Sequence, residues 1–104
     1  MAGYLIIWGV INMAKIKLTK PLNVAGKDVT EVEINPEKLS GNDLVAAETE
    51  VRAMGEHAPS VFVSMRYQAV LAGKLIGVPV DDIMGLPAID FRNVTYELAS
   101  FLLN

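Results

Sequence analysis

Residues 60–79 read SVFVSMRYQAVLAGKLIGVP and carry helix signals at both ends. Ser60 is a favourable residue at the start of a helix, and Gly77 can end one in the left-handed conformation. The sequence therefore predicts a helix that is capped by Ser60 and runs to Ile76. Apolar side chains cover most of its circumference, which is typical of a helix that is central or covered by a partner. They are Val61, Phe62, Val63, Met65, Tyr67, Ala69, Val70, Leu71, Ala72, Leu75 and Ile76.

The residues before this stretch predict an amphipathic helix. Ser40 or Asn42 can cap a helix that begins near Asp43, and Gly55 and Pro59 bracket the break that follows it. We expect one face of this helix to be buried, because its apolar residues recur at helical spacing. These residues are Leu44, Ala47, Val51 and Met54.

Further towards the N-terminus, apolar and polar residues alternate. Residues 13–34 read MAKIKLTKPLNVAGKDVTEVEI, and a period of two is the signal of a β-strand. Gly26 lies between the two apolar runs and can adopt the positive φ of a tight reversal, so we predict a β-hairpin. Pro21 cannot donate a ladder hydrogen bond, and the first strand should therefore be an edge strand or bend there. The solvent face should carry possible cross-strand pairs among Lys15, Lys17, Glu31 and Glu33.

After the central stretch, the segment VPVDDIMGLP predicts a single short helical turn. Asp81 and Asp82 stand at its start, where carboxylates face the positive end of the helix dipole. A last helix should begin at Pro87, with Asp90 in its first turn. Its apolar stripe consists of Phe91, Val94, Leu98, Phe101 and Leu102. The predicted fold class is α+β: an N-terminal β-hairpin followed by three main α-helices, with a short helical turn before the last. We expect residues 13–104 to form a single domain.

Composition narrows the possible functions. The 104 residues are 52% hydrophobic and carry a net charge of −3, with no cysteine. The absence of cysteine removes disulfides and thiolate ligands, and suits a reducing compartment. Lys and Arg are scattered along the chain, which disfavours nucleic-acid binding. A mean hydropathy of +0.36 is high for so short a domain, so we expect some apolar surface to be left for a partner.

Residues 1–12, MAGYLIIWGVIN, stand apart as an apolar N-terminal extension. The segment has about half of the ~20 residues that a transmembrane helix needs, so no membrane association is expected. It also lacks the basic start and the cleavage site of a signal peptide. The cleaner pattern starts at Met13, which leaves open that residues 1–12 are an upstream extension of the reading frame.

The sequence offers no convincing catalytic or metal-binding set. His57 is the only histidine and lies in a polar break without a second soft ligand, so neither a metal nor a cofactor is expected. Ser60 and Ser64 lie near it, but nucleophilic catalysis also needs an orienting acid and an oxyanion hole. Asp81 and Asp82 are adjacent on a helical turn and point about 100° apart, which suits helix initiation better than acid-base chemistry. We therefore predict a protein that is not an enzyme.

The order of these segments resembles the family of phage tail assembly chaperones, particularly the short type of contractile-tailed bacteriophages. The resemblance covers residues 13–103. It combines the basic hairpin KIKLTKPLNVAGKDVTEVEI, the helix opening LSGNDLVAAE and the closing signature LAGKLIGVPVDDIMGLPAIDFRNVTYELASFL. The positions that match the closing pattern are Leu75, Gly77, Pro79, Leu86, Pro87, Asp90, Phe101 and Leu102.

This resemblance implies a non-catalytic chaperone in the cytoplasm of the bacterial host, which keeps a tape-measure protein soluble during tail assembly. Such a role suits a helix-in-groove interface with aromatic anchors, and we expect Phe62, Tyr67, Phe101 and Leu102 to contact the partner. The alternative that each of them simply packs in the core stays open. A self-associating structural component of the tail, a generic small interaction domain and a ligand-binding domain or enzyme are the competing functions. Homo-oligomerisation also stays open.

Overall fold

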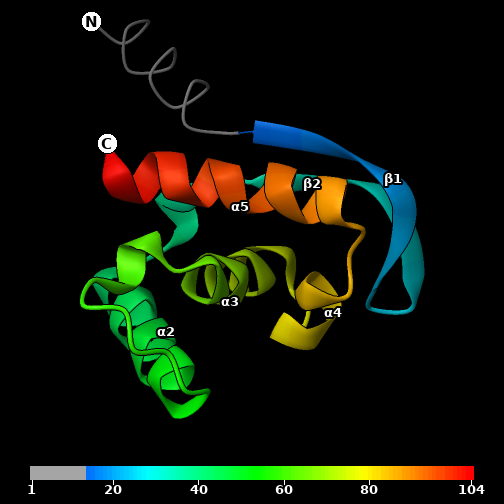
Figure 1. Ribbon diagram of the computed structural model, residues 1–104. Helices are drawn as coiled ribbons and strands as arrows, with labels where there is room; N and C mark the ends of the chain where they lie inside the picture. The colour runs from blue at the N-terminus through cyan, green and yellow to red at the C-terminus, as the bar shows by residue number, and fades with distance from the viewer. Residues whose placement is uncertain (1–13) are drawn as a thin grey trace, which may run out of the picture.

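The computed structural model describes residues 14–104, so the expectations for residues 1–12 lie outside the described residues. A β-hairpin is followed by helices, and the predicted α+β class is confirmed (Figure 1). The elements are β1 (Ala14–Val24), β2 (Lys27–Ile34), the 3₁₀ turn η1 (Pro36–Lys38), α2 (Gly41–Ala53), the 3₁₀ turn η2 (Val61–Val63), α3 (Met65–Ile76), α4 (Val80–Met84) and α5 (Ala88–Leu103).

The hairpin closes through a two-residue turn. Ala25 and Gly26 both have positive φ values, 52° and 84°, as a tight reversal between twisted strands requires. Lys17 lies opposite Glu31 and Leu22 opposite Val29, with an irregular register between these two pairs. Pro21 lies within this irregular stretch, and β1 is an edge strand because the described sheet has two strands, which agrees with the prediction of an edge strand or a bend at the proline.

Helix α2 begins two residues earlier than predicted, and Ser40 is its cap. The Ser40 hydroxyl accepts a hydrogen bond from the Asp43 N–H, and the Asp43 carboxylate accepts one from the Ser40 N–H at 2.8 Å. This reciprocal arrangement satisfies donors that the first helical turn leaves free. Ala47 and Val51 are buried as expected, whereas Met54 follows the last helical residue and is exposed.

The prediction of one helix from Ser60 to Ile76 is wrong at its start. Ser60 makes no capping hydrogen bond with its side chain, and residues 61–63 form the separate turn η2. Ser64 is extended (φ −82°, ψ 125°), and its hydroxyl accepts the Tyr67 N–H. A serine that bonds the backbone ahead of it starts a new helix, so α3 begins at Met65.

Helix α3 ends at a close approach between backbone segments. Gly77 has φ 92°, and the N–H groups of Gly77 and Val78 both donate to the Gly73 carbonyl. A Cβ on Gly73 would lie 2.7 Å from the carbonyl oxygen of Val78. Gly77 therefore supplies the predicted left-handed end, and Gly73 lets the chain turn back beside the helix.

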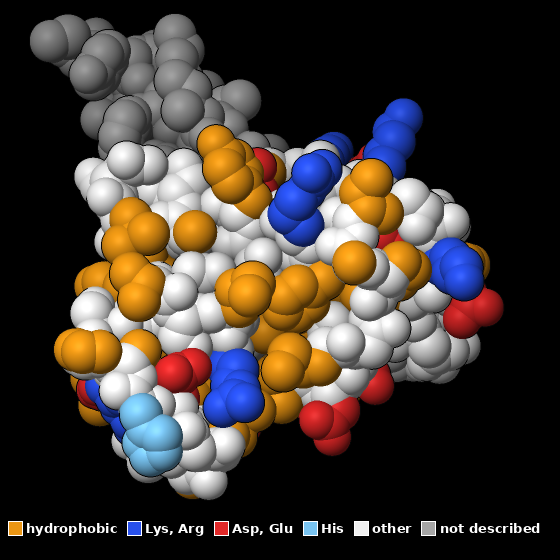
Figure 2. Space-filling model, in the orientation of Figure 1, with side chains coloured by type: hydrophobic (Ala, Val, Ile, Leu, Met, Phe, Trp, Pro, Cys, Tyr) orange, Lys and Arg blue, Asp and Glu red, His pale blue; other side chains and the backbone are white. Residues whose placement is uncertain are grey.

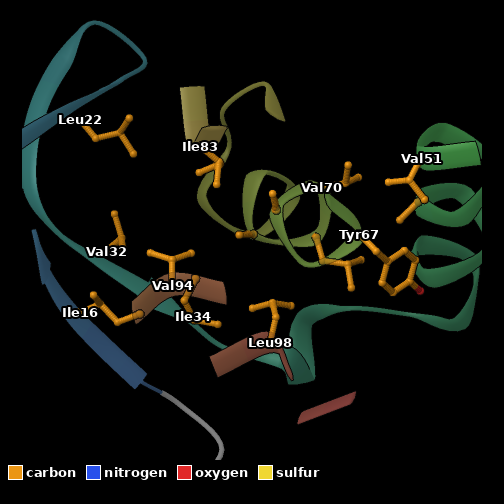
Figure 3. Packing of buried hydrophobic residues seen from close by; sticks show 14 of the residues in the cluster. Ile16, Leu22, Val32, Ile34, Val51, Tyr67, Val70, Ile83, Val94 and Leu98 are labelled. Carbon is orange, nitrogen blue, oxygen red and sulfur yellow. The ribbon is translucent and has the colours of Figure 1, made fainter. Parts of the chain in front are cut away.

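The core forms around α3, whose residues 67–73 are all buried. Helix α3 packs against α2, α4, α5 and β2, and α5 packs against both strands (Figure 1). Val94 and Leu98 of α5 face the apolar residues of the hairpin and α3 (Figure 3). Of the two alternatives that the sequence left open for the apolar helix, a central position and cover by a partner, the structure shows the first for α3.

Helix α5 carries a buried carboxylate that ties it to the first strand. Pro87 precedes the helix, so α5 starts one residue later than predicted. Asp90 is fully buried, and both of its carboxylate oxygens accept the Thr19 N–H at 3.0 Å. The Thr19 hydroxyl adds a third hydrogen bond at 2.9 Å. The sequence predicted only that Asp90 lies in the first turn of this helix, but Asp90 also joins two segments 71 residues apart.

Candidate partner-binding surface

Large apolar side chains reach the surface on η2, at the start of α3, on α2 and along α5. Figure 2 shows hydrophobic side chains gathered below the C-terminal end of α5. Single exposed apolar residues are normal on a small domain. A cluster of large apolar residues, in contrast, commonly marks an interaction site. The exposed large apolar residues in the described part of the chain are Val45, Met54, Phe62, Val63, Met65, Met84, Ile89, Tyr96, Phe101 and Leu103.

The four residues expected at the interface lie in two places. Phe62 on η2 is 37% exposed, and its ring lies 5.8 Å from that of Tyr67 at α3. Phe101 near the end of α5 is 42% exposed, and Leu102 beside it is partly buried against the core. The two places are neighbours, because α5 packs against η2 (Figure 1).

Tyr67 differs from the other three residues because only 1% of it is exposed. Its hydroxyl donates to the Leu44 carbonyl of α2 at 2.9 Å, and this links α3 to α2. Burial raises the pKa of the phenol, and the nearby Glu48 carboxylate raises it further. Tyr67 therefore acts as a support beneath Phe62, and its ring offers almost no surface for direct contact.

The loop between α2 and η2 is held by a polar network. Arg52 donates to the carbonyl oxygens of Glu56 and Ala58, at 3.2 and 2.6 Å. The Glu56 carboxylate accepts the Ser64 hydroxyl and the Ala58 N–H. The Ser64 hydrogen bond is the first cause, and the Ala58 bond the second, of a Glu56 pKa below its ordinary value. These bonds fix the loop that presents η2.

An open groove separates α2 from η2, and we call it the α2–η2 groove. It has a volume of about 500 Å³, and Tyr67 lies at its base. Its walls are apolar except at the Glu48 carboxylate, the Ser60 and Tyr67 hydroxyls, and Gly41, which has no side chain. The lining residues are Gly41, Leu44, Val45, Glu48, Pro59, Ser60, Val61, Phe62 and Tyr67.

Several exposed apolar residues were not predicted as interface residues. Val63 and Met65 were assigned to one continuous apolar helix, but they lie on either side of the break at Ser64, and both are exposed. Ile89, Tyr96 and Leu103 recur every seven residues on α5 and are all exposed. Seven-residue spacing places side chains on one side of a helix, and this signal was available in the sequence.

The ionisable residues considered for catalysis lie apart in the structure. His57 is exposed in the loop after α2, and Asp81 and Asp82 are exposed in the first turn of α4. Within residues 14–104, no cluster of His, Asp and Glu could hold a metal ion. Every buried side-chain nitrogen or oxygen in that range has a hydrogen-bond partner.

None of the helices described in residues 14–104 has the length and apolar character needed to cross a membrane.

Comparison with known proteins places the chain in a family. The family model described as "Phage tail assembly chaperone proteins, E, or 41 or 14" matches residues 15–103. The matched range extends from β1 to the last residue of α5. No curated protein matches the chain, and no solved structure matches it.

Proposed function

Because this chain belongs to the family of phage tail assembly chaperones, we propose that it is a non-catalytic chaperone that binds a tape-measure protein. In this role it acts in the cytoplasm of the bacterial host, before the tail tube polymerises. The family assigns the chain to tail assembly and implies a protein partner in the tail. The identity of that partner is the proposal.

The exposed apolar surface on η2 and the end of α5 is the observation that carries this proposal. The resemblance implies a long partner that must be kept soluble, and any apolar helix in it would stay soluble only while its apolar face is covered. Phe62 and Phe101 are exposed aromatic residues, a type enriched at the centres of protein interfaces. Leu102 lies next to Phe101 and adds apolar area to the same end of α5. We assign direct contact with the partner to these three residues.

Co-expression with the tape-measure protein of the same phage tests the proposal. The wild-type chain should co-purify with the tape-measure protein and raise its soluble fraction. The double variant Phe62→Ala and Phe101→Ala should lose at least about 1–2 kcal/mol of binding free energy, as truncation of anchor residues commonly does. Ala46→Ser, at an exposed position of α2, is the matched control. A tape-measure protein that stays insoluble and unbound beside the wild-type chain would refute the function.

A structural tail component is the competing function, since exposed apolar surface also suits self-association. The two functions differ in where the chain is found after assembly. Mass spectrometry of purified virions should detect a structural component in many copies, whereas a chaperone should be missing. Sedimentation of the purified chain at several concentrations measures self-association separately.

A further inference from the structure

Glu48 places one carboxylate at the edge of the otherwise apolar α2–η2 groove. Within residues 14–104 its only charged contact is Arg52, at 3.6 Å, and both side chains are partly exposed. Arg52 donates hydrogen bonds to the carbonyl groups of Glu56 and Ala58, at 3.2 and 2.6 Å, and both are shorter than its 3.6 Å contact with Glu48. The Glu48 carboxylate accepts no hydrogen bond within the described residues, so it can pair with a donor from outside.

The charge around the groove favours a basic partner. Among the described residues that line the groove, only Glu48 carries a charge, and it is negative. Residues 39–104 as a whole, elements away from the groove included, contain four Lys and Arg against eight Asp and Glu, a net charge of −4. The carboxylate of Glu48 is close enough to the base of the groove to raise the pKa of Tyr67. Asp43, on the same helix, is already bonded to Ser40. Glu48 is therefore the carboxylate that a cation beside the groove would meet.

The groove can receive a large apolar side chain. Leu44, Val45 and Phe62 form apolar walls, and the groove is open to solvent. On a helix, residues three or four apart lie about 5–6 Å from each other on the same side. A helix can thus place an apolar side chain between the walls and a basic side chain at Glu48 at the same time.

We propose that the α2–η2 groove receives one large apolar side chain from an amphipathic helix of the tape-measure protein, and that a Lys or Arg one turn away on that helix pairs with Glu48. This inference rests on the proposed function for the identity of the partner. It adds the position of the contact and the sequence pattern that the chaperone selects.

The test is a calorimetric titration of the full chain with soluble peptides from the tape-measure protein of the same phage. Val45→Glu puts a charge in the groove and Ser60→Trp fills it, and each should raise Kd at least about tenfold. Ala46→Glu is the control for the first change, because Ala46 is exposed on α2 and does not line the groove. Circular dichroism of each variant checks that the fold is kept.

The ion pair is tested by charge reversal. Glu48→Lys should raise Kd at least about tenfold, whereas Glu50→Lys, with the same change in net charge, should leave it within about twofold. Overlapping peptides from the tape-measure protein should bind only where a basic residue lies three or four positions from a large apolar one. Replacing that basic residue by Glu should abolish binding to the wild type and restore it to Glu48→Lys.

The outcomes separate this inference from the proposed function. If the wild type binds the tape-measure protein and the groove variants bind equally well, the groove assignment is overturned and the chaperone function stands. If the wild type does not bind, both are overturned. A dimer that Ser60→Trp dissociates would show that a second copy occupies the groove, and this too would overturn the inference.

Discussion

The hydrogen-bonding role of the buried Asp90 carboxylate could not be predicted from the sequence. The helix dipole alone can account for a carboxylate in the first turn of a helix, without any hydrogen-bond partner. The structure adds the Thr19 N–H and hydroxyl, which satisfy both carboxylate oxygens. A buried carboxylate is costly unless it is hydrogen-bonded, so we expect these three bonds to stabilise the folded state.

Removing this carboxylate should destabilise the protein. Asp90→Ala leaves the Thr19 N–H without its partner, and we expect a loss of about 2–3 kcal/mol in the free energy of unfolding. Urea denaturation followed by circular dichroism measures it. Asp82→Ala, which removes an exposed carboxylate from α4, should change stability by less than about 0.5 kcal/mol. Equal stability of the two variants would contradict a structural role for Asp90.

Gly73 allows a second test at the level of a single residue. An alanine in a helix is normally favoured over glycine by about 1 kcal/mol. At Gly73, however, the added Cβ would meet the Val78 carbonyl oxygen at 2.7 Å, and backbone has to shift. We expect Gly73→Ala to lower the free energy of unfolding by about 1–3 kcal/mol. Gly41→Ala is the matched control, because nothing lies within 4 Å of its added Cβ, and thermal melts should show no loss for it.

At the scale of whole elements, the sequence predicted most of the fold. The alternation of residues 13–34 identified the hairpin, and the Gly77 position identified the end of α3, because both signals are local. The start of α3 was wrong for an equally physical reason. Ser60 and Ser64 are both good caps, and the choice between them depends on Glu56, which accepts the Ser64 hydroxyl from across the loop. Local patterns do not contain that contact.

The same contact predicts how the loop before η2 responds to acid. The Glu56 pKa is lowered in the folded protein, so its bonds contribute stability above the unfolded pKa and lose it as pH falls through the folded pKa. Glu56→Gln should be less stable than the wild type at pH 7, and the difference should shrink below about pH 4. Chemical denaturation at pH 7 and pH 3 measures both values. Glu50→Gln, an exposed change on α2, should show no such convergence.

For the whole molecule, the family and the fold class followed from the order of the segments, and the match over residues 15–103 confirms the family. The interface residues were harder to predict. A helix with apolar residues on most sides does not reveal which side the rest of the chain will cover, since that depends on packing between distant segments. Tyr67 and Phe62 looked equivalent in the sequence, yet one is buried and the other exposed. Contact of Phe62, Phe101 and Leu102 with a partner stays a prediction.

Two residues of α5 separate stability from binding. Leu98 is fully buried and Phe101 is 42% exposed on the same helix. Leu98→Ala should cost about 2–5 kcal/mol of unfolding free energy, whereas Phe101→Ala should cost less than about 1 kcal/mol. Phe101→Ala should instead weaken capture of the tape-measure protein. Urea denaturation and co-purification, performed on both variants, measure the two effects. A large loss of stability in Phe101→Ala would mean that this side chain belongs to the core.

The link between Thr19 and Asp90 also bears on how quickly the native state is reached. A two-stranded hairpin by itself is marginally stable in water, and this one is completed by a helix that begins more than fifty residues further along. Contacts between such distant segments form late in folding, because the entropy cost of closing the long loop comes before the contacts stabilise the chain. Refolding should therefore occur in one cooperative step in which strand and helix lock together, with slower kinetics than a simple helical bundle of this size.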